Sequence, residues 1–511
     1  MKIQSMLVIG TLALAAGEQS VAAVSCASLK TLKIADTRIT LAEDVTPNPE
    51  WKLPPSVFTG PAAAGLPGAR STKVPFCRVA LTVGKENRIE VWLPRNWNGA
   101  FQGVGNGGLT GGINYPAMVP ALESGFATAS TDTGHTTDDF FDTSWITGFP
   151  DRVIEFGHRA HHEMAVAAKQ VVAKFYDKPA RKAYYSGCSS GGWQGLTEAQ
   201  KYPEDYDGII AGAPAINFVR LQSRTIMEQQ LDAKEPGSYV TAELGRLLVD
   251  AAVAKCDAID GIKDGVIDDP RACNFDPAEL QCKSGQVKAC LKPGEVKRAK
   301  WLYGRLTTPK GLKLYPGPAL GAPPTTAVPG VDPRHPADMA IVLMMQETPP
   351  SISYKNFDPD THIPLLEQRF GADLDAMNPD LSAFKARGGK LILYHGWADQ
   401  LLSPYNTLDY YASVQQKMGG DQQDFMRLFM VPGMWHCAGG PGPDQFNAVD
   451  ALTKWVEHGA APAQMVASHA APGGKVDRTR PLCVYPQVAK YKGSGSTDDA
   501  ANFSCVAPKA T

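Results

Sequence analysis

The segment GCSSGG, at residues 187–192, places Ser189 in the spacing G-x-S-x-G. A serine in this spacing typically lies in a sharp turn between a strand and a helix, where its hydroxyl is exposed. The flanking sequence agrees, because residues 183–186 read as a short strand and residues 190–201 read as a helix. A hydroxyl presented in this way can attack an ester or amide carbonyl when a base accepts its proton. The same spacing also occurs in ordinary glycine-rich turns, so the interpretation depends on finding the partners of the serine.

The partners of such a serine are a histidine base and a carboxylate that orients the histidine. Asp399 follows the apolar stretch KLILYH, and His436 follows the apolar stretch FMRLFMV. The chain order Ser, Asp, His, with each residue after a predicted strand, is the order found in α/β-hydrolases. Asp409 and His395 compete with Asp399 for a role, but only Asp399 lies in the turn directly after its strand. We therefore predict that Ser189 is the nucleophile, His436 the base and Asp399 the residue that orients the base.

Two backbone amides are needed to stabilise the oxyanion that forms when a serine attacks a carbonyl. The amide of Ser190, directly after the nucleophile, is the first expected donor. The second is expected from the glycine-rich loop after an early strand, at Gly107 or Gly108. The alternative for this loop is an ordinary turn, and the sequence does not choose between the two glycines.

Strand-like and helix-like segments alternate around this serine. The strands are expected at residues 88–93, 100–104, 126–130 and 208–212, with a long amphipathic helix at residues 151–176. This alternation predicts an α/β protein whose mainly parallel sheet is covered on both faces. The alternation stops between about residues 215 and 388, where proline, glycine and cysteine are frequent and the stretch is too long for a simple loop. We therefore predict an α/β-hydrolase fold with a large inserted lid domain.

The predicted organisation has a leader, a catalytic domain in two segments and a lid. These parts are a signal peptide at residues 1–23, the catalytic domain at residues 24–214 and 389–511, and the lid domain at residues 215–388. Lys2, the apolar run at residues 6–16 and small residues up to Ala23 predict the signal peptide, with cleavage after Ala23 or, alternatively, after Ala22. A membrane anchor is disfavoured because the apolar run is too short to span a bilayer. We expect a secreted or periplasmic protein that does not associate with membranes.

The composition excludes one class of partner and predicts disulfides. The formal net charge is −2 and charged residues make up 20% of the chain, so no basic excess indicates binding to nucleic acid. All ten cysteines follow the predicted signal peptide, and in an oxidising compartment an even number of cysteines is expected to pair. The sequence contains no C-x-x-C pair, which disfavours a zinc ribbon. Neither the pairing of the cysteines nor the oligomeric state follows from the residues.

The segment between Cys256 and Cys273 is rich in aspartate and glycine. It contains Asp257, Asp260, Asp264, Asp268 and Asp269, with Gly261 and Gly265 between them. Hard cations such as Ca²⁺ bind carboxylate and carbonyl oxygens, which a short loop with glycines can bring together. The spacing is not that of an EF-hand, and a solvated acidic turn is an equally good interpretation of these residues alone.

A second polar group lies within the predicted helix at residues 151–176. It consists of His158, His161, His162 and Glu163. His158 and His162 are one helical turn apart, but the H-E-x-x-H arrangement of metallopeptidases is absent. The pattern favours a polar helix face over a metal site or a catalytic site.

The motifs GCSSGG, HGWAD and HC occur in this order, and together they resemble the tannase and feruloyl esterase family. The resemblance extends over nearly the whole mature chain, from about Cys26 to Cys505. It implies an α/β-hydrolase that cleaves esters of aromatic acids, such as ferulate, other hydroxycinnamates, gallate and terephthalate monoesters. No organic cofactor is expected.

The resemblance also implies pairs for the cysteines and ligands for a metal. The family's distinguishing disulfide, between the cysteine before the nucleophile and the cysteine after the base, would be Cys188–Cys437. The other implied pairs are Cys26–Cys77, Cys256–Cys273, Cys282–Cys290 and Cys483–Cys505. A structural Ca²⁺ in the lid, distant from the chemistry, would be held by the side chains of Asp257, Asp260 and Asp264 and the carbonyls of Ile262 and Val266. This implication favours calcium over a solvated turn.

The acid that the enzyme accepts depends on the lid, where the sequence is least informative. A terephthalate or phthalate monoester carries a free carboxylate and would require a cation in the pocket, such as a lid arginine. Arg334 and Arg369 are candidates by position, but neither lies in a recognisable motif. We therefore expect a serine carboxylesterase acting on phenolic-acid esters through an acyl-enzyme, with a monoester hydrolase as the alternative. An alternative of another class is a non-catalytic, calcium-dependent binding protein, which the intact set of Ser189, Asp399 and His436 disfavours.

Overall fold

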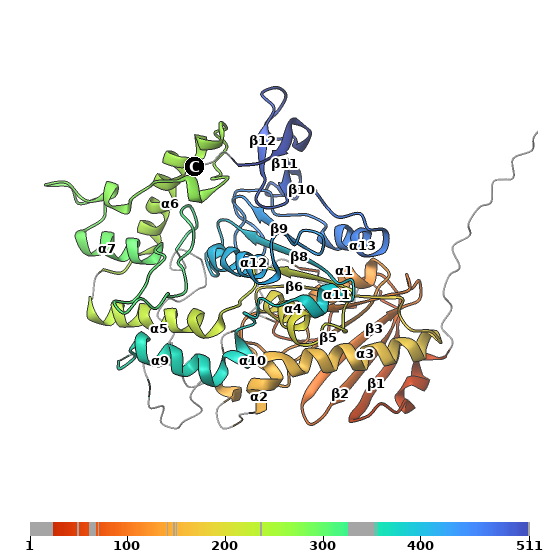
Figure 1. Ribbon diagram of the computed structural model, residues 1–511. Coiled ribbons are helices and arrows are strands. Elements are labelled where there is room, and N and C mark those ends of the chain that lie inside the picture. The colour runs from red at the N-terminus through yellow and green to blue at the C-terminus, as the bar shows by residue number, and fades with distance from the viewer. Residues whose placement is uncertain are drawn as a thin grey trace, which may run out of the picture.

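A nine-stranded sheet runs through the computed structural model of the protein (Figure 1). The structure describes residues 24–48, 51–60, 68–69, 71–140, 142–146, 149, 151–235, 238–324, 352 and 355–508. The predicted signal peptide at residues 1–23 and the candidate Arg334 lie outside the described residues. None of the described helices is long and apolar enough to cross a lipid bilayer.

The strands of the sheet follow the spatial order β1-β2-β3-β5-β4-β6-β7-β8-β9. Their bounds are β1 Thr37–Val45, β2 Phe76–Val83, β3 Asn87–Pro94, β4 Ala100–Val104, β5 Ala127–Thr131, β6 Lys182–Cys188, β7 Gly208–Gly212, β8 Lys390–Gly396 and β9 Met426–Val431. The pairs from β1 to β3 and between β3 and β5 are antiparallel, and every pair from β5 through β4 to β9 is parallel. The parallel strands β4, β5 and β7 are buried along their whole length, which explains their continuous apolar or small-residue sequences. The sheet is therefore mainly parallel, as the alternating pattern predicts.

Helices cover both faces of the sheet. Those of the catalytic part are α1 Tyr115–Glu123, α2 Asp151–Ile154, α3 Ala160–Tyr176, α4 Ser190–Lys201, α12 Pro404–Met418 and α13 Ala448–His458. Side chains of α3, α4 and α12 share one hydrophobic cluster on one face, whereas α13 and the end of α1 belong to a second cluster on the other. These two layers hold the carboxyl ends of the parallel strands in place, and the candidate catalytic residues follow these ends.

The helix expected over residues 151–176 is interrupted by one turn of wider winding. Residues Glu155–Arg159 form a π-helical turn between α2 and α3. Gly157 lies within this turn, and a Cβ there would stand 2.6 Å from the carbonyl oxygen of Asp373. His158 in the same turn contacts the side chain of Asp373 at 3.1 Å. The wider turn thus accommodates a close approach by the segment that returns from the lid, a tertiary contact that helical periodicity does not report.

The chain leaves the sheet after β7 and returns at β8, and these two strands are hydrogen-bonded neighbours. The helices in between are α5 Phe218–Lys234, α6 Ala242–Cys256, α7 Pro293–Leu302, α9 Pro359–Leu366, α10 Ala372–Leu374 and α11 Ser382–Ala386. Figure 1 shows α5, α6, α7 and α9 to the left of the sheet. Side chains around α6 and α7 form a separate hydrophobic cluster that includes Leu248 and Val296. This excursion has the position of the predicted lid, whose boundaries at residues 215 and 388 stay a prediction.

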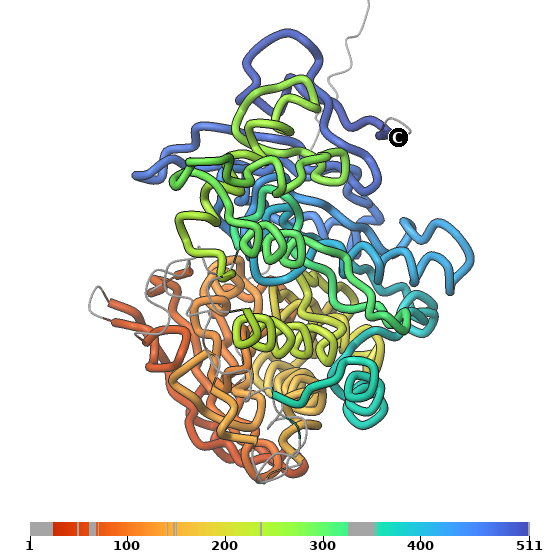
Figure 2. The backbone as a smooth tube through the Cα atoms, turned by 90° about the vertical axis from the view of Figure 1, so that its left-hand side faces the viewer, coloured from red at the N-terminus to blue at the C-terminus, as the bar shows by residue number. Residues whose placement is uncertain are grey.

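Two small hairpins follow the last helix, and the sequence analysis did not anticipate them. They consist of β10 Gln464–Ala470 with β11 Val476–Cys483, and β12 Val488–Tyr491 with β13 Phe503–Val506. The disulfide Cys483–Cys505 joins β11 to β13. Figure 2 shows the blue C-terminal hairpins beside the green lid segment, where Arg480 of β11 forms an ion pair with Asp264. The C-terminal hairpins therefore hold one end of the lid.

Candidate active site

Ser189 lies in the turn between the end of β6 and the start of α4. Its backbone has φ 63° and ψ −125°, a conformation that costs free energy for any residue other than glycine. Three backbone hydrogen bonds hold it there, because its amide donates to Gly212 at 3.0 Å and its carbonyl accepts from Trp193 at 3.0 Å and from Ala215 at 3.1 Å. This strained turn is the serine elbow that the G-x-S-x-G spacing predicts.

The glycines of the motif are required by the close packing around the elbow. A Cβ at Gly192 would stand 2.2 Å from the carbonyl oxygen of Gly212 on the neighbouring strand. A Cβ at Gly191 would stand 2.9 Å from the carbonyl oxygen of Asn106. The absence of a side chain at Gly192 lets α4 lie close to the end of β7, and its absence at Gly191 lets the glycine-rich loop at residues 105–108 approach the first turn of α4.

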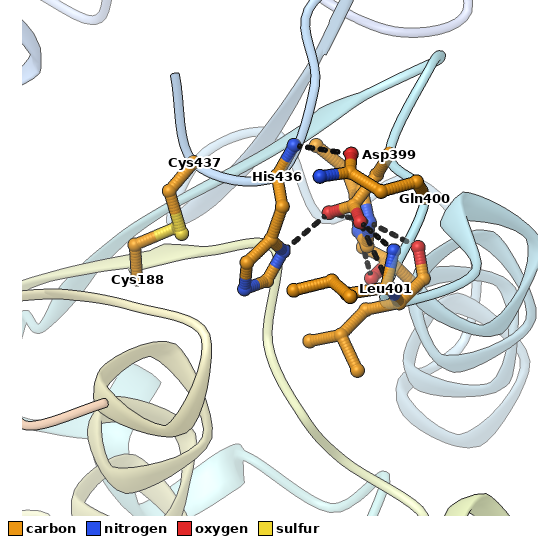
Figure 3. The surroundings of a disulfide bond; sticks show 9 residues. Cys188, Asp399, Gln400, Leu401, His436 and Cys437 are labelled. Atoms are coloured by element: carbon orange, nitrogen blue, oxygen red, sulfur yellow. Dashed lines mark hydrogen bonds and ion pairs between the residues drawn. A yellow bond between two sulfur atoms is a disulfide. The ribbon is translucent and has the colours of Figure 1, made fainter. Parts of the chain in front are cut away.

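Asp399 and His436 form the pair that the sequence predicts. Nδ1 of His436 lies 2.8 Å from Oδ2 of Asp399 (Figure 3). Asp399 is fully buried, and its Oδ1 accepts hydrogen bonds from the amides of Leu401 and Leu402, both at 2.9 Å. Nε2 of His395 lies 3.3 Å from Oδ2. The carboxylate is therefore surrounded by donors.

These donors decide the charge state of Asp399. Burial by itself raises the pKa of a carboxyl group, but His436 and His395 outweigh it and hold the pKa of Asp399 well below its usual range. An ionised Asp399 requires a hydrogen on Nδ1 of His436, which leaves Nε2 of His436 to accept a proton. The pair can therefore supply the general base that a serine nucleophile needs.

A disulfide joins the serine turn to the loop that carries the histidine. Cys188 precedes Ser189, Cys437 follows His436, and their Cα atoms lie 6.0 Å apart across the bond (Figure 3). The two cysteines are 249 residues apart in the sequence. Cys437 has a positive φ of 63°, so both ends of the bond adjoin backbone in an uncommon conformation. The other four pairs implied by the family resemblance are also present, and no cysteine is free in the described part of the chain.

The glycine-rich loop lies against the elbow, where the oxyanion donors are expected. Oγ of Ser190 donates a hydrogen bond to the carbonyl of Gly108 at 2.6 Å, and Gly108 has a φ of +61°. The amide of Asn106 donates to Gln194 and the amide of Leu109 donates to Phe140. Within the described residues, the amides of Gly107 and Gly108 have no such protein acceptor. Both glycines remain candidates for the second donor, and the choice between them stays a prediction.

Comparison with known proteins agrees with this geometry. A family model described as tannase and feruloyl esterase matches residues 76–333 and 345–506. The chain belongs to the tannase and feruloyl esterase family. It is therefore a carboxylic ester hydrolase with the α/β-hydrolase fold, and the alternative of a non-catalytic binding protein has no support.

Individual members of the family resemble the chain along most of its length. A probable feruloyl esterase B of Aspergillus clavatus is 32% identical over 99% of this chain and 99% of its own. The mono(2-hydroxyethyl) terephthalate hydrolase of Piscinibacter sakaiensis is 35% identical, covering 83% of this chain and 82% of its own. The crystal structure of feruloyl esterase B from Aspergillus oryzae superposes with a TM-score of 0.82 at 28% identity, covering 94% of this chain and 99% of that one.

The acidic loop of this esterase's lid is closed by the disulfide Cys256–Cys273. Its carboxylates cap backbone turns: Asp257 accepts from the amides of Asp264 and Gly265 at 3.1 Å, and Asp260 accepts from the amide of Ile262 at 2.9 Å. Across the described residues, no three His, Cys, Asp or Glu side chains are arranged to hold a metal ion. The calcium ligands implied by the resemblance, including Val266, therefore stay a prediction.

The chemistry of this loop nevertheless suits a hard cation. All of the candidate donors are oxygen atoms, the ligand type that Ca²⁺ prefers. Burial, followed by the charges of Asp260 and Asp269, raises the pKa of Asp268 to about 7. Burial likewise raises the pKa of Asp260, with further contributions from Asp264 and Asp257. A bound cation would offset this crowding of like charges.

The histidine group in α2–α3 does not form one site. His158 contacts the hydroxyl of Tyr202 at 2.6 Å and Asp373 at 3.1 Å, whereas His162 contacts Asp205 at 2.6 Å. His161 is buried, and its ring nitrogens have no hydrogen-bond partner in the described part of the chain. The three rings therefore lie in separate environments, and only His158 and His162 lie on the polar face that the sequence predicts.

Two residues beside Asp399 were not assigned a role by the sequence analysis. Oε1 of Gln400 accepts a hydrogen bond from the amide of His436 at 3.1 Å, which ties the histidine loop to the aspartate loop. His395 contacts Asp399 from the end of β8. Their positions in the stretch HGWADQ are the sequence signal for both residues. The Gln400 contact joins loops that are far apart in the chain, whereas His395 is four residues from Asp399.

Proposed function

We propose that the enzyme hydrolyses esters of aromatic acids, phenolic acids foremost, through an acyl-enzyme formed on Ser189. The observation that carries the proposal is the buried Asp399–His436 pair, held to the serine elbow by the Cys188–Cys437 disulfide. The family membership supports the reaction class, and the relatives named feruloyl esterase support the substrate class.

The reaction has two steps, acylation and deacylation, and in each step His436 accepts a proton and then donates it. Oγ of Ser189 attacks the ester carbonyl carbon while Nε2 of His436 takes the hydroxyl proton. The oxyanion is stabilised by the amide of Ser190 and that of Gly107 or Gly108. The carbon–oxygen bond to the alcohol breaks, and His436 gives its proton to the leaving alcohol. Water then attacks the acyl-enzyme with His436 again as base, which releases the aromatic acid and restores Ser189.

Two lid arginines in the described part of the chain bear on the choice between a neutral and a charged acid. Arg224 lines the small cavity beside the loop at residues 400–403, which follows Asp399. Its guanidinium already donates to three backbone carbonyls, those of Tyr315, Trp301 and Leu302. Arg369 is exposed, and its guanidinium lies over the ring of Phe370, 5.1 Å from the centroid. The fork of Arg224 is therefore occupied, whereas stacking over a ring does not occupy the N–H donors of Arg369. We retain phenolic-acid esters as the first choice because the relatives named feruloyl esterase support them.

Steady-state rates on methyl ferulate, methyl gallate and mono(2-hydroxyethyl) terephthalate test this choice. We expect kcat/KM to be higher for at least one of the two phenolic esters than for the terephthalate monoester. A preference of more than about tenfold for the charged monoester, equivalent to about 1.4 kcal/mol, would instead establish the monoester hydrolase alternative. Loss of all three activities in Ser189→Ala, with the protein still folded, assigns them to the proposed nucleophile.

We also propose that the lid binds one structural Ca²⁺ at Asp257, Asp260 and Asp264, and that the protein is exported. The oxygen-only donor set supports the first proposal, and the five disulfides support the second, because disulfides persist in oxidising compartments. Elemental analysis of the purified protein should find about one calcium per chain. Mass spectrometry of the exported chain should find an N-terminus at Val24, or at Ala23 for the alternative cleavage site.

A further inference from the structure

His395, near the end of β8, is fully buried beside the candidate catalytic acid. Its Nε2 lies 3.2 Å from the carbonyl oxygen of Leu402 and 3.3 Å from Oδ2 of Asp399. Both atoms only accept hydrogen bonds, since Asp399 is ionised, so Nε2 must carry the hydrogen. Nδ1 lies 2.8 Å from the hydroxyl of Thr407, which can donate to it. A neutral ring with this tautomer therefore satisfies every partner of His395.

This hydrogen completes the set of donors around Asp399. Oδ1 receives the amides of Leu401 and Leu402, while Oδ2 faces Nδ1 of His436 and Nε2 of His395. A carboxylate held at both oxygens cannot rotate without breaking at least two of these contacts. The same Nε2 also contacts the carbonyl of Leu402. One nitrogen of His395 therefore contacts both Asp399 and the loop in which Asp399 lies.

We propose that His395 is a positioning residue for ester hydrolysis: its Nε2–H keeps Oδ2 of Asp399 directed at His436 and thereby orients the base. The inference rests on the proposed roles of Ser189, His436 and Asp399. His395 does not touch the substrate, and it acts only through Asp399. At metal sites, partners of this kind orient the groups that do the chemistry, and their loss commonly costs about 10–100-fold in affinity or activity. We expect a loss of similar size here, because His395 likewise orients a carboxylate that orients a histidine.

The surroundings distinguish this role from that of an ordinary core histidine. A residue needed only for packing at the end of a buried strand would be apolar, because a buried imidazole must find partners for both nitrogens. His395 faces the hydroxyl of Thr407 from α12 and Asp399 from the loop after β8. Beyond Asp399 lie His436, from the loop after β9, and the Tyr315 hydroxyl of the lid, whose pKa burial raises above its usual value. Among the described residues, the only ionised group against His395 is thus the carboxylate that it contacts.

Two substitutions separate the nitrogens of the ring. His395→Gln places a side-chain amide donor near the position of Nε2 and should keep the contact with Asp399. His395→Asn is one carbon shorter, so it retains a polar group toward Thr407 but does not reach Asp399. Thr407→Val, which removes the hydroxyl beside Nδ1 and leaves the Nε2 contact in place, is the matched control.

The measurement is the pH profile of kcat and KM with 4-nitrophenyl acetate, an activated ester that does not depend on the choice of acid. We expect His395→Asn to lower kcat about 10–100-fold with KM within about twofold of wild type. Its acidic limb should move to higher pH, because a carboxylate with one donor fewer holds the proton on His436 more strongly. His395→Gln and Thr407→Val should stay within about threefold of wild-type kcat and keep the wild-type profile.

Equal losses in His395→Gln and His395→Asn, or a loss with an unchanged pH profile, would overturn the proposal and leave a purely structural role. Wild-type kcat in His395→Asn would also overturn it. If His395→Asn does not fold, as judged by near-ultraviolet circular dichroism, the glutamine variant still decides: wild-type behaviour supports positioning and a tenfold loss opposes it. Fluorophosphonate labelling checks the premise separately, because labelling that persists in Ser189→Ala would refute the nucleophile assignment and not the role of His395.

Discussion

Two clusters in this molecule contain aspartates, and their carboxylates respond to opposite surroundings. The catalytic cluster consists of Asp399, His436 and His395, and the lid cluster consists of the aspartates at residues 257–269. Around the catalytic loop, Asp399 is fully buried, yet contacts with His436 and His395 hold its pKa below the usual range. In the lid, burial and neighbouring carboxylates raise the pKa of Asp260 and that of Asp268, the latter to about 7. Burial alone therefore does not decide the charge of a carboxylate. The balance between hydrogen-bond donors and neighbouring like charges also contributes.

The two disulfides differ in the same way. Cys188–Cys437 joins segments 249 residues apart, each beside a proposed catalytic residue, whereas Cys256–Cys273 joins cysteines only 17 residues apart. In the first cluster, the protein's own hydrogen-bond donors compensate the charge of Asp399. In the second, arginines pair with Asp264 and Asp269, but burial and neighbouring carboxylates still raise the pKa of Asp260 and Asp268. A bound cation would offset these like charges. We therefore expect changes in the first to affect catalysis and changes in the second to affect stability.

The largest expected effect is in the catalytic cluster, on Asp399→Asn. An asparagine can hold the His436 ring in the wrong tautomer, and the equivalent change in a serine protease triad lowers kcat by about 10⁴-fold. We expect a comparable fall in kcat on methyl ferulate with a thermal midpoint near that of wild type. A loss of less than about tenfold would show that another residue orients the base.

Next in size is the removal of the long-range disulfide by Cys188→Ala with Cys437→Ala. We expect the double variant to fold but to lose on the order of 10²-fold in turnover, because a misplacement of about 1 Å between serine and histidine can cost that much. The matched control is Cys256→Ala with Cys273→Ala, which should lower the thermal midpoint and leave kcat of the folded fraction near wild type. If both pairs affected kcat equally, the contrast between the two clusters would be wrong.

Calcium removal tests the lid cluster directly. Dialysis against a chelator should lower the thermal midpoint by several degrees, and readdition of Ca²⁺ should restore it, because a ligand that binds only the folded state stabilises that state. Asp257→Asn should reduce the calcium content measured by elemental analysis and the response to chelation together. An unchanged thermal midpoint after chelation, with no calcium found in the untreated protein, would favour the solvated acidic turn.

The smallest effect concerns Asp375, a carboxylate near the return from the lid that resembles the lid cluster and not Asp399. Burial raises its pKa from the usual 3.8 to about 6, although the amide of Val219 donates to it. The folded state therefore favours the neutral acid, and the stability that this provides below pH 3.8 is lost as the pH rises to about 6.

The substitution Asp375→Asn tests this, because asparagine stays neutral and its side-chain oxygen can still accept from the amide of Val219. Urea unfolding at pH 7 should find the variant more stable than wild type by on the order of 1–2 kcal/mol, since one pKa unit corresponds to about 1.4 kcal/mol. No gain at pH 7 would show that the carboxylate is better compensated than its surroundings indicate.

Much of the fold and the site could be predicted from the sequence because the signals are local. The strand before Ser189, the glycines around it and the apolar stretches before Asp399 and His436 are properties of short segments. Local periodicity also located β3, β5 and β8 within one or two residues of their observed bounds. It did not report the π-helical turn at Glu155–Arg159 or the C-terminal hairpins. The turn lies against Asp373, and the hairpin of β10 and β11 packs against α13 and the sheet, so both involve contacts with distant segments.

The sequence by itself determined the chemical types and their order: a serine in an elbow, a carboxylate, a histidine, and ten cysteines in a chain with no basic excess. Only the tertiary structure decided which groups surround Asp399, since His395 reaches it across a turn, His436 comes from the loop after β9, and Cys437 is bonded to a cysteine 249 residues away. The physical reason is that residue types follow from the local chain, whereas the pKa of a buried carboxylate depends on donors and charges that folding collects from distant segments. The structure likewise showed that Arg224 is already occupied by backbone carbonyls, which no spacing in the sequence could report.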